Sequence, residues 1–509
     1  MYETRLAKKG DMPLPKDRYN DVATEIRRLI QETHDASEGF RAYGSAWSMS
    51  NIAHNKDRMH FNAPMNISFM FSAQDLHTQS PFDHDNLFMF ECGNIIKEVT
   101  NKLEANGKSL KTTGASNGQT IVGCISTGVH GSAIDVGSVQ DYVVGLNIIT
   151  GPNPEDVVYL ERHSKPALND AFAQSINAKV IRNDGLFNAA LVGLGAFGFI
   201  HGVVIEAEDR YLLKRYVKQI DKNVALELAK TLDFKNSSFT IPGETDGNGK
   251  GNRPYHYKVF LNQYKNDDKY IVEFIYKKPY ATPYPDPRPL IEKSIYRDLI
   301  GLIISLSEQM PKIIPTFINL LKNSLLPSVD EESIGTLGQT FWDALYKGPA
   351  FAISFGVDHR NSDKALKLLS DVTINEGPVP GIFAARFIKK SNATLSFAKF
   401  PTTCMIEIDG VLWKDSDNII SLTTLARRMI ETLKANNIPF TMHWGKNSDW
   451  AFPGLVNHMY GNKAKEWKTF RSALLSEDMQ KLFSNDFLET VKLSNRETPI
   501  PPDLIASLI

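Results

Sequence analysis

The eighteen residues from Gly114 to Gly131, GASNGQTIVGCISTGVHG, contain five glycines, four Ser or Thr residues, one His and no charged side chain. Glycines let a backbone approach a ligand closely, and the N–H groups and hydroxyls between them can hold an anion without a fixed positive charge. A Gly/Ser-rich surface loop is the alternative, since such clusters are common in turns. The apolar residues around Ile121 and Ile125 favour a segment that folds against a large, flat bound group. We therefore predict a cradle for a phosphate-bearing cofactor.

The bulk composition narrows the class of protein. With 509 residues the chain is too long for one ordinary core, so we expect two domains. Its 57 basic and 58 acidic side chains balance, so we expect no nucleic-acid partner. Three scattered cysteines without CxxC spacing indicate neither a disulfide framework nor a zinc site, and we expect no metal. Because the first residues lack the apolar stretch of a secretory signal, a cytoplasmic location is expected.

The secondary-structure pattern changes near residue 210. Before that point we predict helices over 21–34 and 95–105 and strands at the start of 40–50 and over 87–90, 141–149 and 203–207. After it, strand patterns at 255–261, 269–276, 350–357, 382–388 and 404–408 are separated by helical stretches such as 363–369 and 419–433. The second part is therefore predicted to be an α+β domain built on an antiparallel sheet.

Three segments interrupt that second part. Residues 243–254 are predicted to be a flexible hairpin tip, and residues 279–289, with five prolines, an extended connector. Neither is expected to be catalytic. Residues 295–326 form an apolar helical region broken at Pro311 and Pro315. We expect a buried helical pair there, with a lid for a hydrophobic substrate or a peripheral membrane contact as the alternatives.

The residues from Gly193 to Gly198, GLGAFG, formally fit the dinucleotide-binding motif GxGxxG. That motif requires a strand before it, a helix after it and an acidic residue about 20 positions further on. Here the strand-like stretch 199–205 follows at once, and Glu206 comes only eight residues after Gly198. We therefore predict that this part of the chain is not a Rossmann fold.

The segment 119–131, QTIVGCISTGVHG, resembles the flavin-binding signature of the vanillyl-alcohol oxidase and p-cresol methylhydroxylase (PCMH-type) superfamily. It is most similar to the sugar-lactone (gulonolactone and arabinonolactone) and alditol oxidases, which carry a sequence like QTIAGAISTGTHG. Three more blocks fall in the family's order: FRAYGSAWSMS at 40–50, LFNAALVGLGAFGFIHGVVIEA at 186–207 and MHWGK at 442–446. The resemblance covers most of the chain.

The resemblance implies an α+β flavoprotein. It implies an FAD-binding PCMH-type domain over 1–210, a substrate-binding cap domain with an antiparallel sheet over 211–440, and a C-terminal segment, 441–509, that returns to the FAD domain. It also implies hydride transfer from a hydroxyl-bearing carbon of a small molecule to flavin N5, with dioxygen or another acceptor reoxidising the flavin. The alternatives are a hydrophobic, sterol or natural-product substrate, including epimerase-type chemistry, and a flavin-binding protein without turnover.

The same blocks supply the expected FAD contacts. The family commonly has GSGHS, with a covalently bonded His, where this chain has Trp47, so we expect noncovalent FAD. Gly114 and Ala115 are expected near the reactive edge of the ring, where a small residue leaves space for dioxygen. Backbone groups near Ile200 are expected to meet the adenine, and His130 to shape the cradle rather than catalyse. The expected cofactor-binding residues are Tyr43, Gly44, Ser45, Ala46, Trp47, Ser48, Gly114, Ala115, Gln119, Thr120, Gly123, Ser126, Thr127, His130, Gly131, Ile200 and Lys446.

The expected catalytic residues lie in the second half. Arg386 matches the arginine of the family's EVRF-type strand, where a cation near flavin N1 and the C2 carbonyl stabilises the reduced ring. Two positions earlier, Ala384 replaces the usual substrate-binding glutamate, and strand alternation lets Glu407 face the cavity as a substitute carboxylate. Lys446 and His443, in MHWGK, are expected to orient a hydroxyl and to carry a proton.

Overall fold

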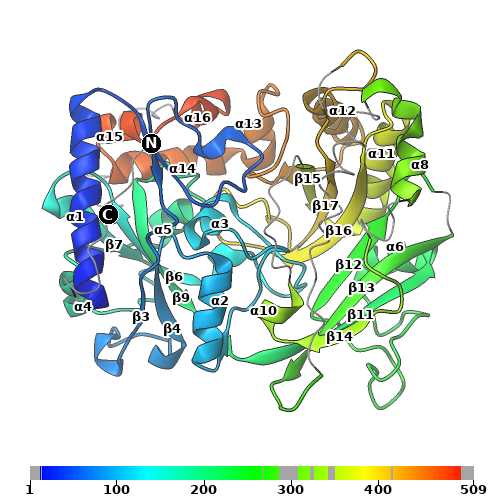
Figure 1. Cartoon of the computed structure of the whole chain (residues 1–509), viewed down its shortest axis with the longest axis horizontal. Helices are drawn as coiled ribbons and strands as arrows, with labels where there is room; N and C mark the ends of the chain where they lie inside the picture. The colour runs from blue at the N-terminus through cyan, green and yellow to red at the C-terminus, as the bar shows by residue number, and fades with distance from the viewer. Residues whose placement is uncertain are drawn as a thin grey trace.

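Two large sheets dominate the molecule, one built from strands before residue 207 and one from strands after residue 210 (Figure 1). The computed structural model describes residues 12, 14–265, 268–285, 308–320, 326–341, 350–413 and 416–494. Most of the segment 295–326 lies outside these residues, but helix α8 (Ile314–Leu320) buries Ile314 and Ile318. Among the described residues, no helix has both the length and the apolar character needed to cross a membrane.

The first sheet has six strands in the order β3-β4-β9-β6-β7-β8. Neighbours are antiparallel except for the parallel pair β7-β8. Every residue of β4, β6 and β7 is buried, as their nearly continuous apolar sequences require. The strands are β3 (Ser68–Met70), β4 (Leu87–Glu91), β6 (Val143–Ile149), β7 (Val157–Glu161), β8 (Lys179–Arg182) and β9 (Phe199–Glu206).

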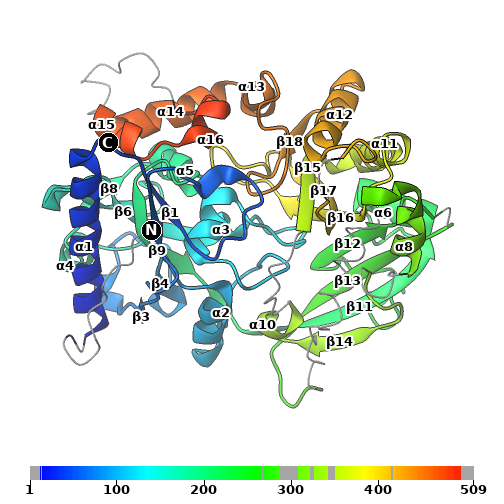
Figure 2. The ribbon, with the colours of Figure 1, turned by 45° about the horizontal axis from the view of Figure 1, so that its top comes forward.

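Helices cover both faces of this sheet. Leu87 and Met89 share one core with α1, whereas Phe88 and Phe90 share the other with α2, α3 and α5, because successive side chains of a strand point to opposite faces. Helices from the end of the chain lie on this half, α14 against α5 and α15 against α1 (Figure 2). The helices are α1 (Pro15–Asp35), α2 (Ile96–Ala105), α3 (Ile121–Thr127), α4 (Asp170–Ser175), α5 (Asp184–Leu191), α13 (Leu455–Tyr460), α14 (Asn462–Leu474), α15 (Glu477–Leu482) and α16 (Asp486–Thr490).

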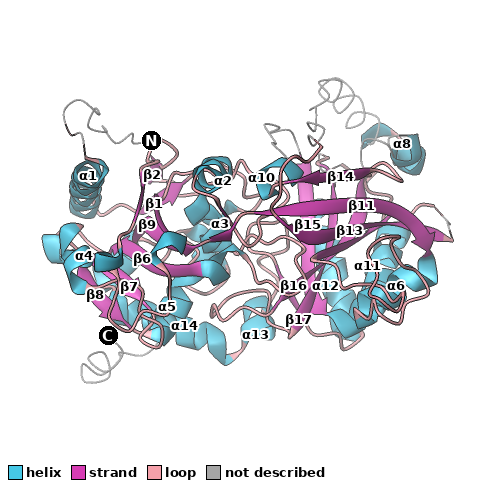
Figure 3. Ribbon diagram, turned by 90° about the horizontal axis from the view of Figure 1, so that it is seen from below, coloured by secondary structure: helices cyan, strands magenta, loops and turns pink. Residues whose placement is uncertain are grey.

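The second sheet has eight strands in the order β14-β11-β13-β12-β16-β17-β15-β18, all antiparallel (Figure 3). This confirms the predicted α+β architecture with an antiparallel sheet. Helices α6 (Lys222–Thr231), α11 (Ser362–Asn375) and α12 (Leu422–Ala435) lie on the side away from the first sheet (Figure 1). The strands are β11 (Tyr211–Asp221), β12 (His256–Leu261), β13 (Lys269–Pro279), β14 (Glu332–Gly335), β15 (Ala350–Asp358), β16 (Gly381–Lys389), β17 (Thr402–Val411) and β18 (Phe440–Met442), and the short helix α10 (Leu337–Thr340) follows β14.

Some elements differ from the sequence predictions, and one prediction is confirmed. In the two large sheets, strands β3, β7, β8, β11, β14 and β18 were not predicted, and residues 121–127 of the cradle form helix α3 rather than a loop. The GLGAFG segment lies between helix α5 and strand β9, which confirms that it is not a Rossmann motif. Two minor sheets complete the described strands: β1 (Phe40–Tyr43) pairs with β2 (Arg58–Phe61), and β5 (Lys108–Ser109) pairs with β10 (Glu208–Asp209).

Arg41 of β1 joins several loops through backbone carbonyls. Its side chain is buried, and its guanidinium donates hydrogen bonds to the carbonyl oxygens of Gly195 (2.8 Å), Phe483 (3.0 Å) and Ile52 (2.7 Å). Burial, reinforced by the nearby Arg471, lowers the pKa of Arg41 to about 9. The GLGAFG loop, the C-terminal helices and the segment after β1 therefore depend on one side chain.

We predict that Arg41→Met lowers the free energy of unfolding by about 2–4 kcal/mol, because it leaves several buried carbonyls without a donor. Urea denaturation measures this change. Arg28→Met, which removes the ion pairs of an exposed arginine with Glu25 and Glu32 on α1, serves as the control and should cost about 0.5 kcal/mol or less. A loss for Arg41→Met no larger than that of the control would contradict the prediction.

Candidate functional site

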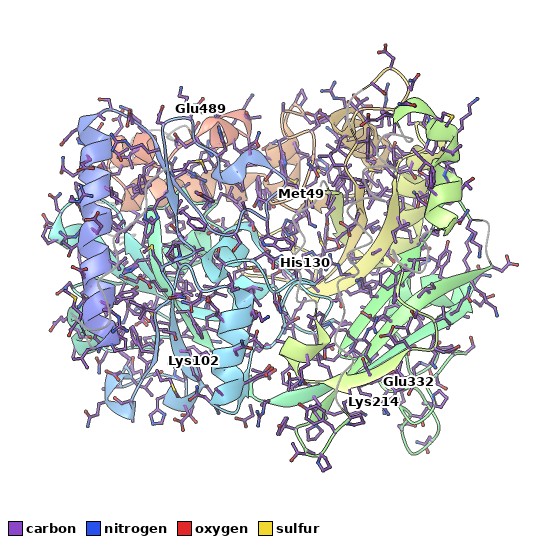
Figure 4. All side chains as sticks on the ribbon, viewed as in Figure 1. Met49, Lys102, His130, Lys214, Glu332 and Glu489 are labelled. Carbon is purple, nitrogen blue, oxygen red and sulfur yellow. The ribbon has the colours of Figure 1, made fainter. Side chains whose placement is uncertain are left out.

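A cavity of about 440 Å³ lies between the two halves of the molecule. Its wall comes from the segment after β1, from the cradle, and from the sheet strands β9, β16 and β17. Figure 4 shows Met49 and His130 near the middle of the molecule, where these parts meet. All predicted site residues except Gly131 line it: Tyr43, Gly44, Ser45, Ala46, Trp47, Ser48, Gly114, Ala115, Gln119, Thr120, Gly123, Ser126, Thr127, His130, Ile200, Arg386, Glu407, His443 and Lys446.

The segment 44–48 offers a row of free backbone donors to this first cavity. None of its five N–H groups donates a hydrogen bond to another described residue. Ala46 has a positive φ of 55°, which turns the backbone sharply. Beyond it, the N–H of Met49 donates to the carbonyl of Gly445 (2.8 Å) and Ser50 Oγ donates to the carbonyl of Trp444 (2.6 Å). These bonds hold the row of donors against the MHWGK segment.

The cradle touches the segment 44–48 so closely that one residue must be glycine. A Cβ on Gly44 would lie 2.0 Å from Oγ1 of Thr120, at the start of α3. Beside it, Oε1 of Gln119 is buried and has no hydrogen-bond partner in the part of the chain that the structure describes. A buried acceptor without a donor is costly, and here it belongs to a residue of the cavity wall. These features fit a ligand that brings its own donors and acceptors.

An ion pair lies in the wall of the first cavity. Arg386 of β16 donates through Nη2 to the carboxylate of Glu407 on β17, and Ser354 Oγ donates to the same carboxylate at 3.2 Å. Glu407 is fully buried and stands directly opposite Ala384 in the strand register. The Glu407 carboxylate thus lies on the strand next to the position where the family's glutamate was expected, and it is already neutralised by Arg386. Nε of Arg386 has no partner among the described residues.

Two histidines offer opposite hydrogen-bonding roles to the cavity. Nδ1 of His130 lies 2.8 Å from the carbonyl of Gly131 and must donate to it, so Nε2 of the neutral ring is an acceptor. Nδ1 of His443 accepts from the N–H of Gly445 at 3.0 Å, so its Nε2 carries the proton. Burial lowers the pKa of both rings well below the usual value for histidine, helped by the positive charge of Arg386. Both rings are therefore neutral near pH 7.

Lys446 lies beside the same group of residues. Its Nζ is 3.8 Å from Oδ1 of Asp409. Burial lowers the pKa of Lys446, and the Asp409 carboxylate opposes that effect. The ammonium is therefore held at the cavity wall by a long, weak ion pair, which leaves its other donor positions available.

A second cavity, of about 630 Å³, opens beside the first. The two share Ala115 and Arg386 in their walls, and Gly131, the predicted residue absent from the first, lines the second. This second cavity lies against the eight-stranded sheet, where Figure 4 labels Lys214 and Glu332. Its charged lining residues are Lys214, Arg215, Lys258, Glu273, Asp330, Glu331, Glu332 and Arg386.

Sequence reasoning missed charged residues in the walls of both cavities. Arg41 lines the first cavity, so the prediction of an anion site without a fixed positive charge is true of the segment 114–131 but not of the cavity. A lone charge in the apolar strand FRAY was the available signal. Lys258 and Glu273 were missed because their register against Arg386 depends on strand pairing that no local pattern specifies.

No protein-family model matches the chain. Among curated proteins, it is 33% identical over 140 residues to L-gulonolactone oxidase 3 of Arabidopsis thaliana, covering 27% of this chain and 21% of that protein. It is 26% identical over 203 residues to D-arabinono-1,4-lactone oxidase of Candida glabrata, covering 40% of this chain and 34% of that one. The chain therefore matches between about a fifth and a third of the length of these relatives.

Solved structures extend the likeness over nearly the whole chain. A cholesterol oxidase from B. sterolicum superposes with a TM-score of 0.65 at 13% identity, over 92% of each chain. A VAO-type flavoprotein from Myceliophthora thermophila gives 0.58 at 11% identity, over 90% of this chain and 76% of that one. The chain therefore shares its fold with a cholesterol oxidase and a VAO-type flavoprotein over nearly its whole length, and parts of its sequence are similar to lactone oxidases.

Proposed function

We propose that this chain is an FAD-dependent oxidoreductase that oxidises a hydroxyl-bearing carbon of a polar small molecule. The observation that carries the proposal is the meeting, in one cavity wall, of a row of free backbone N–H groups with Arg386, His130, His443 and Lys446. The row of N–H groups suits a diphosphate. The four side chains can stabilise charge and transfer a proton at a reacting carbon. The oxidases named among the relatives support the same reaction class.

The first cavity fits FAD in its polar and apolar parts. The N–H groups of 44–48 would hold the diphosphate, with the positive charge of Arg41 nearby in the wall. Trp47 occupies the position of the histidine that forms the covalent link in the family, and an indole offers no equivalent nitrogen nucleophile. We therefore propose that the FAD is bound without a covalent bond.

FAD, when bound, supplies the acceptor for a hydride. The oxidised carbon of the substrate loses that hydride, and its hydroxyl loses a proton, which leaves a carbonyl. In place of the structural role that the sequence led us to expect for His130, we assign the proton to its Nε2, because this atom is the unprotonated ring nitrogen of the neutral histidine. Nε2–H of His443 and the ammonium of Lys446 are the donors that would orient the hydroxyl oxygen. Arg386 would offset the negative charge of the reduced ring.

We also propose an electron acceptor and a substrate class. Dioxygen or another acceptor would reoxidise the cofactor, as the names of the oxidase relatives suggest. Those names include sugar lactones and a sterol. The eight charged residues in the wall of the second cavity favour a polar substrate over a sterol.

We predict that acid precipitation of the purified yellow protein releases its flavin into the supernatant. Trp47 cannot form a histidyl link, so nothing at this position retains the flavin once the chain unfolds. The visible flavin spectrum of the supernatant and of the resuspended pellet measures the partition. Yellow colour retained in the washed pellet would show a covalent bond and contradict the assignment at Trp47.

We predict that His130→Gln slows anaerobic reduction of the bound flavin about 100-fold or more, because the substrate hydroxyl loses its proton acceptor. Stopped-flow loss of the visible flavin band, with a panel of polyols, aldonates and sugar lactones, measures the rate. His359→Gln, outside both cavities, is the control. Equal rates in the His130→Gln variant and the wild type would refute the role of His130. An unchanged flavin spectrum across the whole panel in the wild type would instead favour a flavin-binding protein without turnover.

A further inference from the structure

Lys258 occupies the centre of the sheet face that lines the second cavity. It lies on β12, directly opposite Glu273 of β13 on one side and Arg386 of β16 on the other. All three residues line the second cavity, and Arg386 also lines the first. Lys258 is therefore one strand away from the end that the two cavities share.

The other charged side chains at this inner end have partners. Nε of Arg215 lies 2.6 Å from the carboxylate of Glu273, and its Nη1 lies 3.0 Å from that of Glu331. Arg386 is paired with Glu407. Nζ of Lys258, in contrast, has no carboxylate within 4.0 Å among the described residues. It lies over the ring of Phe260, 4.5 Å from the centroid.

An ammonium in this position is short of a counterion. Taking a charge out of water is costly unless an opposite charge or hydrogen bonds replace the solvent. Burial lowers the pKa of Lys258 to about 8, although the Glu273 carboxylate opposes that effect. The protonated form therefore still predominates at pH 7, and it would gain most from an anion delivered by a ligand.

Two of the acidic residues of this cavity, Asp330 and Glu332, are exposed and already paired. Asp330 and Glu332 both face Nζ of Lys218, at 3.2 and 3.4 Å, and their side chains are 75% and 51% exposed. Solvent screens charges at such a rim. The inner end thus presents an unpaired cation, and the rim presents paired acids in water.

We propose that the second cavity binds a polyhydroxylated substrate that carries an anionic group, a carboxylate or a phosphate ester, and that Lys258 holds this group. The hydroxyl-bearing carbon would then lie toward Ala115 and Arg386, where the two cavities meet. The inference rests on the proposed function for the reaction itself, but it concerns recognition, which can be measured without turnover.

The test is calorimetric titration of the purified flavoprotein with gluconate, sorbitol 6-phosphate and neutral sorbitol. We expect one of the anions to bind at least tenfold more tightly than sorbitol. Lys258→Met should remove that preference while leaving the affinity for sorbitol unchanged, and Lys258→Arg should retain most of it. Lys230→Met, on the exposed surface of α6, makes the same charge change away from both cavities and should alter nothing.

The outcomes separate the two proposals. If gluconate binds more tightly than sorbitol 6-phosphate, the carboxylate is the recognised group. The opposite order identifies the phosphate. Equal binding of the anions and sorbitol, binding of none of them, or a preference that survives in Lys258→Met would overturn the role of Lys258. Flavin reduction, followed separately, reports on the proposed reaction, so tight anion binding without reduction would refute only the function.

We also predict a specific pH dependence of anion binding. The protonated form of Lys258 is the one that binds an anion, so the affinity should fall as the pH rises through about 8 in the wild type. In Lys258→Arg the affinity should stay level over the same range, because arginine keeps its charge. Calorimetry at pH 7 and pH 9 measures the anion affinity of the wild type and of Lys258→Arg. A wild-type affinity that stays the same between the two pH values would contradict the prediction.

Discussion

The hydrogen bonds between the segment after β1 and the MHWGK segment are the interaction on which the site depends. Ser50 and Trp444 are 394 residues apart in the chain, yet the hydroxyl of one bonds the carbonyl of the other. Next to it, the N–H of Met49 bonds the carbonyl of Gly445. One partner belongs to the half built on the first sheet, and the other follows the last strand of the second sheet. The row of N–H groups at 44–48 and the group of His443 and Lys446 can therefore face the same cavity.

Charge balance explains how so many ionisable residues share a buried region. The charges of Arg386 and Glu407 neutralise each other, and the charge of Arg215 is balanced by Glu273. Lys446 makes a long contact with Asp409, whose carboxylate is exposed and therefore screened by solvent. The histidines contribute no charge because burial keeps them neutral. A buried ion pair stabilises little by itself, but removing one partner leaves a costly charge. This arrangement therefore preserves positions of functional groups rather than adding stability, and Lys258 stands out because no described carboxylate matches it in this way.

The sequence predicts more of the site than of the fold that assembles it. The glycine-rich cradle, the segment 40–50 and the MHWGK block were recognisable locally, and their residues do line one cavity. Helix α3 was not recognisable, because IVGCIST combines β-branched residues with glycine and becomes helical through packing in the core. The position of Glu407 opposite Ala384 depends on the register of β16 and β17, and that register is set by long-range pairing. Lys258 and Glu273 were missed for the same reason, whereas Arg41 was missed although it is a lone charge in the apolar strand FRAY.

The likeness to a cholesterol oxidase concerns the fold, and the walls of the second cavity decide what can enter it. A sterol nucleus offers nothing to hydrogen-bond an ammonium or a carboxylate, so packing it against Lys258 and Glu273 would leave both charges without water and without a ligand partner. A hydroxylated, charged molecule replaces the lost water with its own oxygens. If the proposed function is right, the shared fold would hold a polar substrate in this chain, because the side chains that face its second cavity are charged.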